Sequence, residues 1–206
     1  MAEHREFFGR RLHSLLGVVP IGIFLTQHLL VNHFAVYGEE SFNQAAGFMA
    51  GLPFVLLLEI FVIYLPILFH AILGVYIVFV ARNNTRNYGY FRNWMFYLQR
   101  ITGIITLVFI AWHVFETRVQ IALGNAELDY SLMEGILTSP IMFWFYVIGV
   151  LSAVFHFANG LWSFFVTWGI TQTPKSQKIA TYATILIFLG LSFIGMRTLI
   201  TFAYGA

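Results

Sequence analysis

Residues 53–81 read PFVLLLEIFVIYLPILFHAILGVYIVFVA, and this stretch decides the fold class. It contains a single charged side chain, Glu59, and a single histidine, His70. About 20 apolar residues in a helix are enough to cross the hydrocarbon core of a bilayer, and this stretch is longer than that. We therefore expect it to form a membrane-spanning helix.

The rest of the chain has the same character, since 59% of its 206 residues are apolar and 10% are charged. That composition is typical of membrane proteins. When charged residues, glycines and prolines are taken as boundaries, the chain divides into five apolar runs, each longer than about 20 residues. The runs are residues 12–37, 53–81, 94–121, 140–169 and 179–204. The sequence predicts one all-α domain over residues 1–206, integral to the membrane, with five transmembrane helices.

Proline positions suggest where these helices begin and end. Pro53 and Pro140 are expected at helix starts, and Pro174 is expected at a helix end, because proline lacks a backbone donor and has a fixed φ.

The composition of the chain limits its chemistry and its partners. The chain has no cysteine, which excludes disulfides, covalently attached haem and cysteine-ligated iron–sulfur clusters. A net charge of +2 is too small to suggest nucleic acid as a partner.

Basic residues alternate with acidic ones from connection to connection. The segments before the first run, between the second and third, and between the fourth and fifth carry Arg5, Arg10, Arg11, Arg82, Arg86, Arg92, Lys175 and Lys178. The other two connections contain no lysine or arginine and carry Glu39, Glu40, Glu127, Asp129 and Glu134. Because cytoplasmic loops of membrane proteins are rich in lysine and arginine, we expect the amino terminus in the cytoplasm and the carboxyl terminus outside.

The first four runs carry one central histidine each: His28, His70, His113 and His156, at spacings of 42, 43 and 43. Ionisable residues inside a bilayer are costly and usually mark a pathway or a ligand site. Counted from the helix ends at about 1.5 Å per residue, the first and third lie in the outer half of the membrane and the second and fourth in the inner half. In an up-down bundle of the first four helices, this pairs His28 with His113 and His70 with His156.

Two imidazoles that face each other across a bundle favour a haem with two axial histidines over a structural zinc ion, which normally takes four ligands. Small residues share the stripes of these histidines: Gly74, Gly149, Ser152 and Gly160. They would leave room for a porphyrin, or they are ordinary contacts between packed helices. Two haems at different depths would form an electron path across the membrane, with both irons filled so that oxygen does not bind.

Three stretches support a more specific assignment: REFFGRRLHSLLG (5–17), NYGYFRNWMFYLQRITG (87–103) and HFANGLWSFFVTWGIT (156–171). With the four histidines, they resemble the one-polypeptide, dihaem cytochrome b anchor of Gram-positive succinate dehydrogenases. The resemblance covers essentially the whole chain. It implies a membrane anchor of complex II, which takes part in quinone reduction while succinate is oxidised in other subunits.

In that family a flavoprotein and an iron–sulfur subunit dock on the cytoplasmic face of the bacterial inner membrane, and electrons pass through two b-type haems to menaquinone. The resemblance implies that His28 and His113 ligate the outer, lower-potential haem iron, and that His70 and His156 ligate the inner, higher-potential one. FAD and the iron–sulfur clusters would belong to the partner subunits. The pairs are those that helix depth alone indicates.

Glu59 is the candidate proton relay for quinone reduction. It precedes His70 by eleven residues, about three helical turns, which would place it on the same inward stripe near the level of the outer haem. Quinone reduction takes up two protons, and a desolvated carboxyl group can deliver them. The competing explanation is that Glu59 reaches the headgroup region. Glu116 is a weaker candidate, because its position near the interface favours solvation.

Haem propionates need cations or hydrogen-bond donors near the membrane face. Arg11, His13 and Arg100 are the inner candidates, although each can also be explained by snorkelling and by topology. His33 is about 140° around the helix from His28, and His4 precedes the first run, so neither is expected to be an axial ligand.

Two other functions fit part of the pattern. A haem-free transporter or proton channel could use the histidines as a proton relay, and would be colourless. A dihaem cytochrome b could instead serve another dehydrogenase, such as fumarate reductase, formate dehydrogenase or hydrogenase. The regular placement of one histidine in each of four successive runs argues against the last two of these enzymes.

Overall fold

The structure, a computed structural model, describes the backbone of residues 2–205 and the side chains of residues 6–205. All regular elements in that range are helices. Five are long and apolar enough to cross a membrane: Glu6–Tyr37, Val55–Val80, Phe91–Ala122, Pro140–Thr167 and Pro174–Tyr204. The prediction of an all-α membrane protein with five spans is confirmed. The side chains of His4 and Arg5, considered above, lie outside the described residues.

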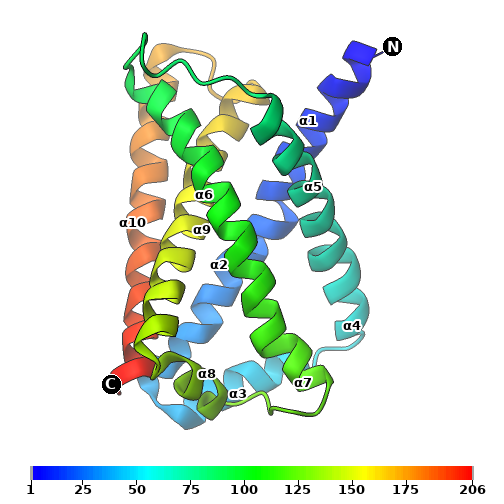
Figure 1. The fold of residues 1–206 in the computed structure, drawn as a ribbon, viewed down its shortest axis with the longest axis vertical. Coiled ribbons are helices and arrows are strands. Elements are labelled where there is room, and N and C mark those ends of the chain that lie inside the picture. The colour runs from blue at the N-terminus through cyan, green and yellow to red at the C-terminus, as the bar shows by residue number, and fades with distance from the viewer. Residues whose placement is uncertain (1, 206) are drawn as a thin grey trace.

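The first span consists of α1 (Ala2–Val18), α2 (Pro20–Asn32) and the 3₁₀ turn η1 (His33–Tyr37). The interruption at Val19 precedes Pro20, which has no N–H to continue the hydrogen-bond ladder of α1. Figure 1 shows α1 and α2 following each other through the full depth of the molecule, with the amino terminus projecting at one end. A single break therefore leaves the span intact.

The second and third spans each contain a π-helical segment. The second is built from α4 (Val55–Leu58), η2 (Glu59–Tyr64) and α5 (Leu65–Val80). The third is built from α6 (Phe91–Val114), η3 (Phe115–Val119) and α7 (Gln120–Ala122). A π turn takes in one extra residue and shifts the helical register by about 100°. The spacing of eleven residues therefore does not by itself assign Glu59 to the stripe of His70, and its role stays a prediction.

The fourth and fifth spans are single helices, α9 (Pro140–Thr167) and α10 (Pro174–Tyr204). Pro140 begins α9 as expected. Pro174 does not end a helix, because it occupies the first turn of α10, where proline is equally favoured. Thr173 caps this turn by accepting a hydrogen bond from the backbone N–H of Ser176 (3.2 Å), whose hydroxyl accepts one from the N–H of Thr173 (3.0 Å).

Two short helices lie in the connections at the end opposite to the amino terminus (Figure 1). They are α3 (Glu39–Ala50) and α8 (Tyr130–Leu137), which the sequence analysis did not expect. The side chain of Asp129 caps α8 by accepting from the N–H of Leu132 at 3.0 Å. The Asn43 side chain in α3 accepts from the N–H of Tyr130 at 2.8 Å, which joins the two short helices.

Successive spans run in alternate directions, so the amino and carboxyl termini lie at opposite ends (Figure 1). The connection that carries Arg82 and Arg86 lies at the end of the amino terminus, as does the start of α10, which carries Lys175 and Lys178. The acidic connections lie at the other end. Helices α6 and α10 both pack along α9, and α1 packs against α5 and α9. Helix α9 is the most enclosed of the spans, since half of the residues in its 18-residue apolar stretch are buried.

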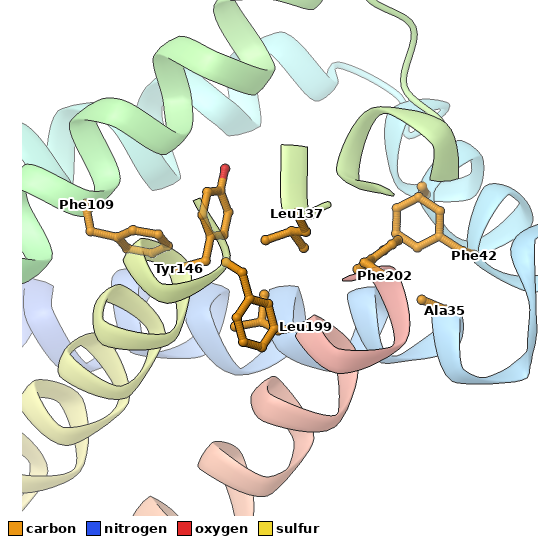
Figure 2. Packing of buried hydrophobic residues seen from close by; sticks show 9 residues of the cluster. Ala35, Phe42, Phe109, Leu137, Tyr146, Leu199 and Phe202 are labelled. Atoms are coloured by element: carbon orange, nitrogen blue, oxygen red, sulfur yellow. The ribbon is translucent and has the colours of Figure 1, made fainter. Parts of the chain in front are cut away.

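The main buried cluster joins α9 and α10 to the short helices at the outer end, by which we mean the end with α3 and α8. Figure 2 labels seven of its members, namely Ala35, Phe42, Phe109, Leu137, Tyr146, Leu199 and Phe202, and the others are Ala46 and Phe143. Elsewhere large apolar side chains cover the outside of the helices, and Pro66 is the one buried residue of α5. Such exposure is expected where lipid rather than water surrounds the chain.

Gly149 allows α9 to approach α6 closely. A Cβ atom on Gly149 would lie 2.2 Å from the base of the Phe109 ring, which leaves no room for a methyl group. The space that this glycine opens is thus occupied by an aromatic side chain. This contact holds the α6 and α9 backbones together at the level of the outer cluster.

We expect Gly149→Ala to destabilise the protein by about 1–3 kcal/mol, because the added methyl group must displace the Phe109 ring or the helix. The measurement is thermal unfolding of the detergent-purified protein. Gly190→Ala is the matched control, since Gly190 lies exposed on α10 and an added Cβ meets nothing within 4 Å. Both changes raise helix propensity equally, so equal unfolding temperatures in the two variants would contradict the proposed contact.

Candidate haem-ligand pairs

His70 in α5 and His156 in α9 form the first pair of imidazoles. Their ring centroids lie 6.0 Å apart, and the ring planes are inclined at 89°. The Nδ1 atom of His70 lies 2.9 Å from the backbone carbonyl of His13, and that of His156 lies 3.0 Å from the carbonyl of Gln99. In both rings Nδ1 is therefore the protonated donor, and Nε2 is left with a lone pair that can bind a metal.

His28 in α2 and His113 in α6 form the second pair, with ring centroids 5.9 Å apart and ring planes inclined at 73°. The Nδ1 atom of His113 lies 3.2 Å from the hydroxyl of Tyr146. The ring of His28 has a different neighbour, since the Asn32 side-chain amide lies 3.4 Å from its Nε2 and donates to its backbone carbonyl at 2.8 Å. The structure thus brings together the two pairs that helix depth indicates.

The separation of the rings fits one iron atom between each pair. A metal lies about 2 Å from an imidazole nitrogen, and the ring centre lies about 1.2 Å further on, so two axial imidazoles have ring centres roughly 6.4 Å apart. The observed separations are 5.9 and 6.0 Å. Among the side chains that the structure describes, no three histidine, aspartate or glutamate residues form a group able to hold a metal ion. The donor set is two imidazoles at a time, which suits a haem.

Glycines lie directly against the inner pair. A Cβ atom on Gly17 in α1 would lie 2.6 Å from the His70 ring, and one on Gly103 in α6 would lie 2.9 Å from the His156 ring. The glycines that the sequence analysis singled out have other neighbours: Gly74 faces His13 and Gly160 faces Gln99. Gly17 and Gly103 could be recognised from their spacing. Each lies four residues after the residue whose backbone carbonyl accepts a hydrogen bond from a ligand histidine.

The inner candidates for propionate contacts lie near the inner pair. The His13 ring stacks on the His70 ring with centroids 3.8 Å apart and planes within 10° of parallel. Arg11 donates to the carbonyl of Thr167 at 3.2 Å. The Nε atom of Arg11 and the Nδ1 atom of His13 are buried and have no hydrogen-bond partner within the described chain. The His13 atom lies beside an inner histidine and the Arg11 atom lies two residues earlier on the same helix, and both fit a ligand that carries acceptor oxygens.

Arg100 lies on α6 at the rim of a groove between α5 and α6. The groove has a volume of about 360 Å³ and is lined by isoleucine and valine side chains together with Asn83 and Tyr97. The guanidinium group of Arg100 donates to the Asn83 side chain and, at 3.2 Å, to the Phe96 carbonyl. A cation at the edge of an apolar slot suits an amphipathic ligand whose charged end reaches the membrane face.

Glu59 lies at the start of η2 and forms an ion pair with Arg118 of η3, with an N–O distance of 2.8 Å. The Glu59 side chain is 20% exposed and that of Arg118 is 41% exposed. The pair links the two π-helical segments, and η2 also packs against α2, the helix of His28. Glu59 is therefore placed at the outer end of the bundle next to a cation that the sequence analysis did not assign to it.

His33 lies apart from the ring pairs, and Glu116 reaches the outer pair only through the Tyr146 hydroxyl. His33 contacts the Thr198 hydroxyl of α10 at 3.0 Å through Nδ1. Glu116 accepts hydrogen bonds from the Trp112 indole at 3.1 Å and from the Tyr146 hydroxyl at 3.2 Å. The partners of the histidines that were not predicted from the sequence are Tyr146, Asn32 and Gln99. Asn32 could have been found, because it follows His28 by four residues, but the others come from different spans and leave no local signal.

Comparison with known proteins identifies two similarities. Residues 81–196 match the family model described as succinate dehydrogenase/fumarate reductase transmembrane subunit. The chain is also 59% identical over 202 residues to the protein named succinate dehydrogenase cytochrome b558 subunit of Bacillus subtilis (strain 168). That alignment covers 98% of this chain and 100% of the relative.

The Glu59–Arg118 pair can be tested by a double-mutant cycle of Glu59→Gln and Arg118→Gln. We expect a coupling free energy of about 1 kcal/mol, the upper end for partly exposed pairs, because Glu59 is largely buried. The measurement is the free energy of unfolding in detergent. Glu6 and Arg10 form a control pair at the same 2.8 Å distance, with both side chains exposed, for which about 0.3–0.5 kcal/mol is expected. Equal coupling in the two cycles would contradict the assignment.

Proposed function

The chain belongs to the family of succinate dehydrogenase/fumarate reductase transmembrane subunits, and from this premise we propose that it is the cytochrome b anchor of a bacterial succinate dehydrogenase. It is a multi-pass membrane protein and a subunit of an enzyme complex. The family description covers both enzymes, and the 59% identity to the Bacillus subtilis subunit favours succinate dehydrogenase over fumarate reductase. In this function the chain joins succinate oxidation in partner subunits to quinone reduction in the membrane.

Two b-type haems are the proposed cofactors, with His70 and His156 as ligands of the inner iron and His28 and His113 as ligands of the outer one. The observation that carries this proposal is the separation of the paired rings, 5.9 and 6.0 Å, which lies within about 0.5 Å of the separation expected for one iron between two imidazoles. When bound, the haems supply two one-electron carriers at different depths of the membrane. The polypeptide supplies the ligands and sets their orientation.

Each inner ligand is oriented by a backbone carbonyl of a neighbouring helix. The carbonyls of His13 and Gln99 hold Nδ1–H, which leaves the Nε2 atoms of His70 and His156 free to bind iron. Arg11 and His13 are the proposed donors to the inner propionates, because each has a buried polar atom without a partner in the described chain. Arg100 at the rim of the groove between α5 and α6 is the third.

The partners are proposed to be a flavoprotein subunit and an iron–sulfur subunit on the cytoplasmic face. The segments with Arg82, Arg86, Lys175 and Lys178 lie at the end of the amino terminus, which the positive-inside rule assigns to the cytoplasm. The inner pair lies toward the same end as α1 and its basic residues. Electrons from the partner subunits would then enter through the inner haem and leave through the outer one.

The quinone is proposed to be menaquinone, reduced near the outer end with Glu59 as proton relay. Glu59 is mostly buried, lies in η2 against the helix of His28, and is bound to Arg118. The ion pair provides both a carboxylate that can carry a proton and a cation that can bind a quinone oxygen. π-helical segments such as η2 and η3 are frequent at functional sites.

The first experiment is a reduced-minus-oxidised spectrum with pyridine-haem quantitation of the purified wild-type protein and of His70→Ala and His113→Ala. We expect two b haems per chain in the wild type, with the inner haem lost or disturbed in the first variant and the outer one in the second. Loss of a single axial imidazole leaves an iron with one protein ligand, which accounts for the selectivity. His33→Ala is the control and should keep both haems, because His33 contacts Thr198.

The two rival functions predict different results. A well-folded wild-type protein without haem would favour a proton transporter in which the histidines act as relays. Two haems in a protein that co-purifies with subunits of another dehydrogenase would reassign the partner and leave the ligand pairs unchanged. Loss of the same haem in both variants would contradict the pairing.

Glu59→Gln tests the relay in the intact complex. We expect electron transfer from succinate to a menaquinone analogue to fall at least tenfold, while electron transfer from succinate to a soluble dye and the haem content stay unchanged, because general acid–base catalysis typically contributes 10²–10⁴-fold. Glu127→Gln is the matched control, an exposed carboxylate in the outer connection. Unchanged quinone reductase activity in Glu59→Gln would assign the proton transfer to another group.

A further inference from the structure

Tyr146 is a buried hydroxyl group inside the membrane region that the proposed function does not use. Its side chain is 2% exposed and belongs to the cluster shown in Figure 2, where the hydroxyl oxygen points out of the cluster. The Tyr146 ring packs edge-on against Phe109, with centroids 5.2 Å apart, and against the His113 ring, with centroids 5.6 Å apart. The ring alone would fill this space, so the hydroxyl needs a separate explanation.

The hydroxyl joins His113 to a carboxylate. It donates a hydrogen bond to Oε2 of Glu116 at 3.2 Å, so its oxygen is free to accept from Nδ1–H of His113, also at 3.2 Å. The Trp112 indole donates to the same Oε2 at 3.1 Å and thereby fixes the carboxylate. The result is a directed chain from an imidazole of α6 through a phenol of α9 to an acidic side chain of η3.

The other three proposed ligand histidines have neutral hydrogen-bond partners. His70 and His156 donate to backbone carbonyls, and His28 has the Asn32 amide beside its ring. A carboxylate at the end of a hydrogen-bond chain makes a ligand imidazole more basic than a neutral carbonyl does. A more basic axial ligand stabilises the oxidised iron more than the reduced iron and so lowers the midpoint potential.

We propose that Tyr146 is a positioning residue that couples His113 to Glu116 and thereby lowers the midpoint potential of the outer haem. The proposal rests on the proposed function, in that it requires His113 to be an iron ligand. Tyr146 orients the ring through its hydroxyl, and Glu116 provides the negative charge. The inner haem has no such chain among the described residues, so the two haems differ in potential through their surroundings although all four ligands are histidine.

Tyr146→Phe in the whole purified complex tests the proposal by potentiometric titration of both haems. Removing the hydroxyl leaves the ring in place and takes the carboxylate out of contact with His113. We expect the outer midpoint potential to rise by an amount equal to about a tenfold change in the reduction equilibrium, which is about 59 mV for one electron. The inner midpoint potential should stay constant. The outer haem is identified as the one lost in His113→Ala.

Glu116→Gln separates charge from hydrogen bonding, because the amide oxygen can still accept from Tyr146. We expect a rise of the outer midpoint potential that is smaller than in Tyr146→Phe. Glu116 is only half-buried, so its substitution disturbs the packing less than that of Tyr146. If Tyr146→Phe does not assemble, the outer midpoint potential of Glu116→Gln tests the proposal. Tyr130→Phe is the matched control, since it removes a hydroxyl bonded to the Thr201 carbonyl (3.3 Å) in the same cluster without touching a histidine.

The outcomes distinguish the inference from the function on which it rests. Two haems with an unshifted outer potential in Tyr146→Phe would overturn the inference and leave the haem assignment standing. An equal shift in Tyr130→Phe, or an equal shift of both haems in Tyr146→Phe, would show a general packing effect and would also overturn it. Absence of haem from the wild type would instead overturn the proposed function.

Discussion

An imidazole buried in a membrane protein needs a partner for each of its two nitrogens, and this requirement organises the centre of the structure. A helix interior offers few free acceptors, because its carbonyls already bond along the backbone. The carbonyls of His13 and Gln99 accept a second hydrogen bond from the side, and they can do so only because Gly17 and Gly103 let the rings approach. Each inner histidine therefore depends on a backbone carbonyl of a neighbouring helix and on the glycine four residues after that carbonyl.

The same requirement explains how much of the site could be predicted from sequence. The five spans and the histidine pairs follow from apolar length, charge and depth, which are local or additive properties of the chain. Tyr146 and Gln99 could not be found that way, because each acts on a histidine of another span and its own neighbours in sequence are ordinary for a membrane helix. Asn32 lies on the same helix as His28 and was within reach of helical periodicity.

The errors in the helix description have physical causes of their own. Proline is favoured both just after one helix and in the first turn of the next, so the sequence alone allows either position for Pro174. The Thr173–Ser176 capping box places Pro174 in the first turn of α10. A π turn leaves the apolar pattern intact and shifts the register, so the position of Glu59 relative to the stripe of His70 could not be read from the sequence. The helices α3 and α8 are short, and no pattern of their length distinguishes them from loops.

Helices α6 and α9 each provide a hydrogen-bond partner for a histidine of the other helix. Helix α6 provides the Gln99 carbonyl for His156 of α9, and α9 provides the Tyr146 hydroxyl for His113 of α6. Half of the residues in the 18-residue apolar stretch of α9 are buried, against 6% in the second and third spans, and α9 packs against α1, α6 and α10. One histidine of each pair therefore lies on the α6–α9 interface, and its partner comes from α2 or α5. Because each of the helices α6 and α9 holds a ring of the other, a shift of α6 along α9 would displace one ring in both pairs at once, so the two pairs depend on the same packing contact.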